Sequence, residues 1–393
     1  MIELSRNEAQ RFLLAKQGLI GNYQFYEKFG VLSFLNRVHA IQYDPVDLCG
    51  KNAEIVLHAR VGAFQKNMLS ELLYSDSELI ESYDKKLCIV VQNDWSKLAP
   101  VRHYKLTRLK ELDGLFDIEA EIMSLLSQQK TVCVKSFSSH KRCKWYWRHD
   151  ASIYQIALER LFIEGKIRIA SREGNIKEYQ LNNLFSDKNS VPNDDYYKWH
   201  IKRRIESIGM LWMAPSPVWE YIPECTLTRR RRMIDELMEQ GEIEEVCIDS
   251  VPRHLYCSRD DFVFLNMDSS TLSRRVEFLA PLDNLLWDRK LVSAIFNFKY
   301  TWEIYVPETK RQFCSYCLPI LWGNDLVGRI DLKVDGTCLV IRNIWIEKPI
   351  DDEFRFLLKE KLLSFARFNS CDAINGIGVV AHIDCGHTIV ADV

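Results

Sequence analysis

Two polar residues near the N-terminus, Gln42 and Asp44, have the types and spacing of a catalytic pair. They lie in the segment Ala40-Ile-Gln-Tyr-Asp-Pro-Val-Asp47, where Pro45 predicts an extended exit from the preceding helix. Alternate side chains of an extended chain point the same way, so Gln42 and Asp44 face one side and Tyr43 the other. A carboxylate beside an amide can position and polarise a water molecule. The simpler alternative is that both side chains only satisfy backbone groups at the helix exit.

The sequence contains no motif of a common cofactor enzyme. It lacks a Walker loop, a Rossmann fingerprint, a zinc-protease helix and a nucleophile elbow. Two groupings suggest metal ligands, Cys314 with Cys317 and His382 with Cys385 and His387, but no second CxxC pair completes a four-ligand zinc site. No carboxylate cluster has the spacing of a metal-dependent nuclease. We therefore expect no cofactor and no bound metal.

Composition predicts a soluble protein of the cytoplasm. The chain has 393 residues, of which 47% are hydrophobic and 27% charged, and no apolar stretch approaches the roughly 20 residues of a spanning helix. Its first residues form an amphipathic pattern rather than a secretory signal. Twelve cysteines are scattered singly along the chain, which favours reduced thiols over disulfides.

Basic residues gather locally although the net charge is only -2. Local charge decides contact with nucleic acid, since the Debye length is about 8 Å at physiological salt. Some of these clusters are interleaved with aromatic residues, and others fall at a helix start or on a turn, which suits phosphate contacts beside apolar wedges. The alternatives are solvated faces and aromatic core. The candidate DNA-binding residues are Lys141, Arg142, Lys144, Trp145, Trp147, Arg148, Arg229, Arg230, Arg231, Lys310 and Arg311.

An internal repeat in the sequence predicts the fold of the middle of the chain. Residues 157–181 and 231–257 share one order of an amphipathic helix, a glycine stop at Gly165 or Gly241, and two short strands joined by a turn. Ser152 and Thr226 are the predicted N-caps of the two helices. A helix followed directly by a hairpin is typical of winged-helix modules, which usually bind duplex DNA.

The remaining segments extend this pattern at both ends. Helices are expected over residues 6–17, which Ser5 caps, and over 24–38, 65–74 and 194–208, with a strand over 87–92. Beyond residue 271 the pattern is one of strands, including residues 302–306, 313–321, 326–334 and 338–347, and a final helix covers 351–369. We expect an α+β protein of about three tandem winged-helix modules and a β-rich C-terminal domain with a covering helix. The predicted boundaries are 1–130, 131–190, 191–265 and 266–393.

These features together resemble the AlkZ/YcaQ family, bacterial DNA glycosylases that unhook interstrand crosslinks and remove alkylated purines. Gln42-Tyr43-Asp44 is similar to the family's catalytic motif of glutamine, a hydrophobic residue and aspartate. The resemblance spans nearly the whole chain. Its other matching segments are residues 279–289, 305–311, 318–321 and 326–333, of which 283–289 is the most specific.

The resemblance implies a fold of three winged-helix units and a β-rich domain, and it implies hydrolysis of the N-glycosidic bond of N7-alkylated purines. Gln42 and Asp44 would be the catalytic residues and duplex DNA with alkylated or crosslinked purines the partner, without a membrane. We expect a monomer, because linked modules already offer a long DNA-facing surface. The motif contains no lysine for a Schiff base, which favours a monofunctional hydrolase, and a lysine from elsewhere in the chain is the open alternative.

One departure from the family pattern follows Glu81. Family members often carry an aromatic pair and a histidine there, whereas this chain has Ser82-Tyr83-Asp84-Lys85. A changed substrate range or rate is the expected consequence. The competing reading of the whole chain is a non-catalytic winged-helix DNA-binding protein, either a transcriptional regulator or a damage-recognition factor. Asp283, Trp287, Asp288 and Arg289 are expected to form an interdomain packing and ion-pair cluster rather than a catalytic one.

Overall fold

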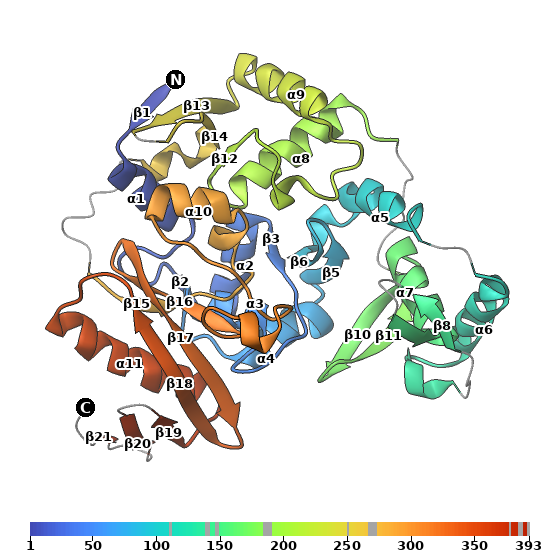
Figure 1. The fold of residues 1–393 in the computed structure, drawn as a ribbon. Coiled ribbons are helices and arrows are strands. Elements are labelled where there is room, and N and C mark those ends of the chain that lie inside the picture. The colour runs from blue at the N-terminus through green and yellow to red at the C-terminus, as the bar shows by residue number, and fades with distance from the viewer. Residues whose placement is uncertain are drawn as a thin grey trace.

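The elements of the chain form an arch (Figure 1). One foot is the C-terminal sheet, and the other is the module that carries α7 (Ile153–Glu164). The computed structural model describes residues 1–109, 112–137, 142–145, 149–183, 191–249, 251–265, 273–376, 379–383 and 388–390. Within these residues, no helix has the length and apolar character that crossing a membrane requires.

The N-terminal elements surround a small sheet in the middle of the arch. Helix α1 (Arg6–Lys16) begins as predicted at Ser5, whose hydroxyl accepts from Glu8 N while the Glu8 carboxylate accepts from Ser5 N. The sheet has the order β3-β6-β5 and is antiparallel. After α1, the N-terminal helices and strands are, in chain order, β2 (Phe25–Tyr26), α2 (Glu27–Val38), β3 (Ala40–Gln42), α3 (Asn52–His58), β4 (Val61–Gly62), α4 (Lys66–Ser70), β5 (Leu79–Tyr83), β6 (Leu87–Val91) and α5 (Ala99–Leu106).

The first predicted helix–hairpin repeat is present. Ser152 caps α7 by accepting from Gln155 N, and Gly165 ends the helix in the left-handed region at φ 80°. The hairpin β10 (Ile167–Glu173) and β11 (Ile176–Leu181) follows directly. Helix α6 (Leu115–Gln128) contacts α7, and β7 (Val132–Cys133) pairs with β11. A second, short hairpin is formed by β8 (Arg142–Trp145) and β9 (His149–Ser152).

The second repeat is also present, in a larger sheet. Thr226 caps α9 (Leu227–Glu239), and Gly241 follows the helix at φ 73°. Its hairpin, β13 (Ile243–Ile248) and β14 (Leu255–Ser258), lies in a sheet of order β1-β13-β14-β12, completed by β1 (Ile2–Leu4) and β12 (Met210–Trp212). Strand β1 runs parallel to β13. Helix α8 (Asp194–Glu206) packs on α9.

The C-terminal unit is a seven-stranded sheet in sequence order, antiparallel except between β18 and β19. Helix α11 (Asp352–Phe368), capped by Asp351, packs against β15 and β19 as the predicted covering helix. Helix α10 (Arg289–Phe296) lies between β15 and β16 in sequence. The strands are β15 (Val276–Phe278), β16 (Cys317–Trp322), β17 (Asp325–Asp335), β18 (Cys338–Ile346), β19 (Ala373–Gly376), β20 (Val379–Ile383) and β21 (Thr388–Val390).

Two sequence-based expectations about local structure are wrong. Residues 302–306 form a loop rather than a strand, because the buried Glu303 carboxylate turns inward and accepts from Gln312 N and Phe313 N at 2.9 Å each. A disulfide joins Cys314 and Cys317, whose Cα atoms lie 5.6 Å apart, so the thiols are not all reduced.

A buried ion pair ties the N-terminal part to the C-terminal part. Arg60 and Asp283 have no exposed side-chain surface, and they form two parallel bonds of 2.7 and 2.8 Å. Arg60 Nε also donates to Gln17 O at 2.9 Å. Asp288 accepts from the Trp212 indole at 2.8 Å and caps α10. The predicted ion pair is confirmed for Asp283, and the predicted packing role is confirmed for Asp288 through its hydrogen bond to Trp212.

Candidate active site

The Gln42-Tyr43-Asp44 segment continues strand β3 beyond its edge of the central sheet. Gln42 pairs with Cys88 of β6, and Tyr43 N donates to Leu87 O at 2.9 Å. The chain therefore stays extended through the motif, as Pro45 predicted. Asn52 of α3 fixes this geometry by donating to Gln42 O at 2.8 Å.

The side-chain amide of Gln42 is oriented by a lysine. Gln42 is only 7% exposed, and its Oε1 accepts from Lys85 Nζ at 3.0 Å. Among the described residues, Gln42 Nε2 has no hydrogen-bond partner within the protein. The amide N–H is therefore the part of Gln42 that remains free to donate to a bound molecule.

Asp44 is half-buried and carries a perturbed carboxyl group. Burial raises its pKa, and the hydrogen bond from Val46 N, at 2.9 Å to Oδ1, opposes that rise. Asp44 Oδ1 accepts the hydrogen bond from Val46 N, whereas Asp44 Oδ2 makes no hydrogen bond to the described residues. A carboxylate with a raised pKa is a stronger base than an ordinary aspartate.

The ring of Tyr43 contacts the hairpin of the first repeat. The Arg172 guanidinium of β10 lies over this ring, 4.2 Å from the centroid, and also forms a bidentate ion pair with Glu81 of β5. Tyr74 donates to the same carboxylate at 2.9 Å. The hairpin β10–β11 extends across the arch toward β5 (Figure 1), so Arg172 near its tip contacts both Tyr43 and Glu81.

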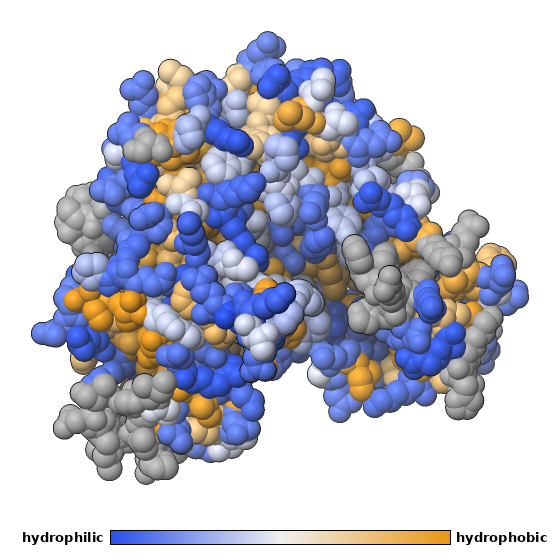
Figure 2. All heavy atoms as spheres, viewed as in Figure 1, coloured by the Kyte–Doolittle hydropathy of each residue, from blue (hydrophilic) through white to orange (hydrophobic). Residues whose placement is uncertain are grey.

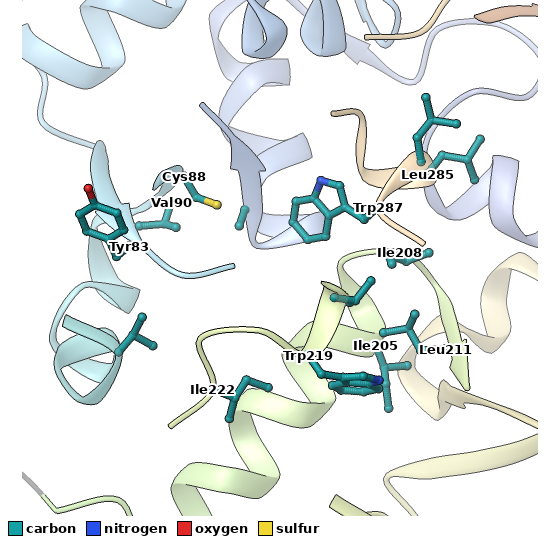
Figure 3. Close-up of a cluster of buried hydrophobic side chains, with 14 of the residues drawn as sticks. Tyr83, Cys88, Val90, Ile205, Ile208, Leu211, Trp219, Ile222, Leu285 and Trp287 are labelled. Carbon is teal, nitrogen blue, oxygen red and sulfur yellow. The ribbon is translucent and has the colours of Figure 1, made fainter. Parts of the chain in front are cut away.

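Lys85 lies in the turn between β5 and β6, beside Trp287. Its Nζ sits 5.2 Å from the centroid of the Trp287 indole, whose Nε1 donates to Leu282 O. Figure 3 shows Trp287 with its ring directed toward the β3–β6 sheet, among buried residues that include Cys88 and Ile208. Burial lowers the pKa of Lys85 to about 8.

The neighbouring Asp84 anchors that turn. Its fully buried carboxylate accepts from three groups of α8, namely His200 Nε2 at 2.9 Å, Arg203 Nε at 3.2 Å and Arg204 Nη2 at 2.5 Å. Burial alone would raise the pKa of Asp84, but Arg204, His200 and Arg203 hold it well below its usual range. The turn that presents Lys85 is therefore rigidly attached to α8.

Sequence reasoning missed Lys85, Arg172 and Glu81 as residues of this site. The departure from the family pattern after Glu81 is the one local signal in the sequence, and it does not indicate that Lys85 contacts Gln42. No local pattern relates position 172 to position 43. Strand pairing and the reach of the hairpin bring these residues together.

The predicted DNA-binding residues of the second module are partly described. Arg142 and Lys144 lie on β8 and are exposed, and Arg142 also donates to Asp150 O at 2.7 Å. Trp145 belongs to the same strand. Lys141, Trp147 and Arg148 lie outside the described residues, as does the side chain of Trp145.

The other predicted DNA-binding residues differ in exposure. Arg231 of α9 and Lys310 are exposed, Arg229 is half-buried and lies over Tyr197, and Arg311 donates to Val306 O. The prediction for Arg230 is wrong. That residue is 4% exposed, donates to Met213 O at 2.6 Å and packs on Trp219, so it faces the core of its own module.

Comparisons with known proteins agree with this arrangement. A sequence profile described as "DNA glycosylase AlkZ-like" matches residues 35–368. The chain belongs to the AlkZ-like DNA glycosylase family. Among solved structures, the DNA glycosylase AlkZ of Streptomyces sahachiroi is similar in fold, with a TM-score of 0.61 at 12% identity over 96% of this chain and 100% of that one.

Family membership makes the protein a DNA glycosylase, an enzyme that hydrolyses the N-glycosidic bond of DNA. The matched range includes the Gln42-Tyr43-Asp44 segment, Lys85 and the buried Arg60–Asp283 pair. Figure 2 shows a hollow in the molecular surface between the module of α7 and the rest of the arch.

Proposed function

We propose that this DNA glycosylase removes N7-alkylated purines from duplex DNA and unhooks interstrand crosslinks, with Gln42 and Asp44 as catalytic residues. The observation that carries this is the extended Gln42-Tyr43-Asp44 segment, which holds an oriented amide two residues from a half-buried carboxylate. A residue pair that served only to cap a helix would not require the buried contact with Lys85.

The chemistry suits a cationic leaving group. An N7-alkylguanine already carries a positive charge, so its departure from C1′ requires no strong general acid. The enzyme must instead stabilise the positive sugar and supply a water molecule. Asp44 acts in its ionised form, either as base toward that water or as the negative charge beside the oxocarbenium. Gln42 holds the same water or the sugar through its free amide N–H.

DNA is held by dispersed cations on three modules. We propose phosphate contacts from Arg142, Lys144, Arg229, Arg231, Lys310 and Arg311, with Lys141, Trp145, Trp147 and Arg148 as further candidates from the sequence. The proposed units are winged-helix modules at 1–130, 131–190 and 191–265 and a β-rich unit at 266–393. A monomer suffices for this surface, and affinity should fall steeply with salt.

The decisive experiment is base excision on a duplex with a single N7-methylguanine. The products are treated with alkali, which cleaves abasic sites, and the strands are resolved on a denaturing gel. Asp44→Asn should lose at least about a hundredfold in rate, the order expected for one positioned catalytic group. Asp47→Asn is the matched control, since Asp47 lies exposed in the same loop and, among the residues that the structure describes, its carboxylate accepts only from Gly50 N.

The outcomes of this experiment distinguish a catalytic from a non-catalytic function. Equal rates for wild type and Asp44→Asn would remove the proposed catalytic role. Tight binding without excision by the wild type would favour the non-catalytic alternative, a regulator or damage-recognition factor. A duplex crosslinked through N7 of two guanines tests unhooking separately, because release of one strand changes its mobility on the denaturing gel.

A further inference from the structure

We propose that Lys85 gives this protein a second activity, cleavage of the DNA strand at the abasic site by a Schiff-base lyase reaction. The inference rests on the proposed function only in one respect, namely that the sugar lies beside Gln42 and Asp44. The hydrolytic step described above is unchanged by it. The lyase step acts afterwards, on the abasic product that hydrolysis leaves in the site.

The contacts of Lys85 are unusual for a buried lysine. The residue is 6% exposed, yet within the described residues it forms no ion pair, and its single hydrogen-bond partner is the neutral amide oxygen of Gln42. Its neighbour Asp84 is saturated by His200, Arg203 and Arg204. Buried ammonium groups are costly unless they are paired. Apart from the Trp287 ring, 5.2 Å from Nζ, Lys85 therefore has no group that offsets its charge, and its amine contacts Gln42 of the candidate catalytic segment directly.

This environment favours a nucleophilic amine. The groups whose charges act on Lys85 are Cys88, Arg204, Lys86 and Glu220. Burial has the largest influence and lowers the pKa to about 8, so a substantial fraction of the side chain is neutral near pH 7.5. A neutral amine also avoids repelling the cationic lesion during the preceding step. The four-carbon stem gives the amine reach toward the sugar once Gln42 releases it.

The reaction balances with the groups present. The Lys85 amine attacks the C1′ aldehyde of the ring-opened abasic sugar, and one water leaves as the iminium forms. The Asp44 carboxylate takes a proton from C2′, the C2′=C3′ double bond forms, and the C3′–O bond breaks with its electron pair leaving on the 3′ phosphate. One water then hydrolyses the iminium and regenerates the amine. The products are a 5′-phosphorylated strand and an unsaturated aldehyde.

The test uses the full chain and a duplex with a preformed abasic site, so that base excision is not required. Sodium borohydride reduces the iminium and leaves a stable protein–DNA adduct, which is resolved on a denaturing gel and mapped by peptide mass spectrometry. We expect an adduct on Lys85, with trapping that increases from pH 6.5 to 8.5. Lys85→Arg should lower trapping at least about a hundredfold, since the guanidinium is not a nucleophile.

Lys86→Gln is the matched control, because Lys86 lies in the same turn but is partly exposed and pairs with Glu220 at 2.7 Å. It should trap like the wild type. The absence of an adduct, or an adduct on another lysine or on the amino group of Met1, overturns the proposal irrespective of how Lys85→Arg folds. Excision of N7-methylguanine without trapping rejects only the lyase, and trapping on Lys85 without excision rejects only the proposed base substrate.

Discussion

The two helix–hairpin repeats of this protein have one sequence pattern and two different surroundings. The tip of the hairpin β10–β11 lies against the candidate catalytic segment. There, Arg172 contacts the Tyr43 ring and forms an ion pair with Glu81. The hairpin β13–β14 is enclosed in a four-stranded sheet between β1 and β12. The same module therefore borders the proposed active site in one copy and serves as scaffold in the other.

The difference is also electrostatic. Arg172 and Glu81 are nearly inaccessible, with side chains 5% and 1% exposed. Arg259, the residue that follows the β13–β14 hairpin of the second repeat, has a side chain that is 51% exposed and pairs with Glu244 of β13 at 2.7 Å. Buried pairs are expensive to break, whereas exposed pairs contribute little. The site-facing hairpin should therefore be the more sensitive one.

The largest expected effect follows from breaking the buried pair. Arg172→Met leaves the Glu81 carboxylate without its cation and should lower the free energy of unfolding by about 3–5 kcal/mol. Arg259→Met, the control, removes the cation that pairs with Glu244 of the other hairpin and should cost at most about 1 kcal/mol. Urea denaturation of both variants measures the two values. Equal losses would show that the hairpins are equivalent after all.

Helix α8 is held to the turn between β5 and β6 in part by His200, which contacts Asp84. The stability of this contact should depend on pH. Burial lowers the folded pKa of His200 to about 4 from an ordinary 6.5, so between these values only the unfolded chain takes up the proton. Stability is then fully present above pH 6.5 and falls as the pH drops toward 4, by about 3 kcal/mol in all. Denaturation midpoints across this window measure the slope, and His200→Gln should flatten it. An unchanged slope in that variant would assign the acid sensitivity elsewhere.

The helix stops should behave alike in both repeats. Gly165 and Gly241 have φ values of 80° and 73°, which an alanine adopts at a cost of about 1–2 kcal/mol. Gly165→Ala and Gly241→Ala should therefore lower the melting temperature by similar amounts. Asparagine tolerates this region better, so the asparagine variants should lose less. A large difference between the two alanine variants would reveal strain specific to one module.

The smallest effect concerns DNA affinity. Arg231 of α9 and Arg142 of β8 are exposed cations on the two repeats, and each alanine variant should weaken DNA binding modestly and uniformly across sequences. Loss of one phosphate contact lowers the slope of log affinity against log salt by about one. Fluorescence anisotropy between 50 and 200 mM salt, roughly the range where such slopes are resolved, measures it. A slope unchanged in one variant would remove that repeat from the DNA interface.

Local signals in the sequence predicted local structure well. Ser5, Ser152 and Thr226 begin helices as expected, because a side-chain oxygen satisfies a free N–H there regardless of the rest of the fold. The strand expected at residues 302–306 failed because the inward Glu303 carboxylate competes for backbone N–H groups. That competition depends on a turn ten residues away and is invisible in a window of strand-forming residues.

The candidate site was predictable only in part. Gln42 and Asp44 stand out locally, whereas Lys85 and Arg172 join them through strand pairing and hairpin reach. Arg230 could have been recognised as buried, since it shares a helical stripe with Met233, Ile234 and Leu237. The run of four arginines, Arg229 to Arg232, has the composition of an exposed basic cluster, and only the helical spacing of Arg230 indicates its burial.

The Arg60–Asp283 pair has a consequence for biosynthesis. These residues are 223 positions apart, so a ribosome adding about 5–20 residues per second needs roughly 10–45 s to supply the carboxylate after the guanidinium has been made. Until then Arg60 has no compensating charge, and the pocket that surrounds it is costly to close. The catalytic segment, built on the same N-terminal elements, should thus mature late in translation and be exposed to chaperones meanwhile.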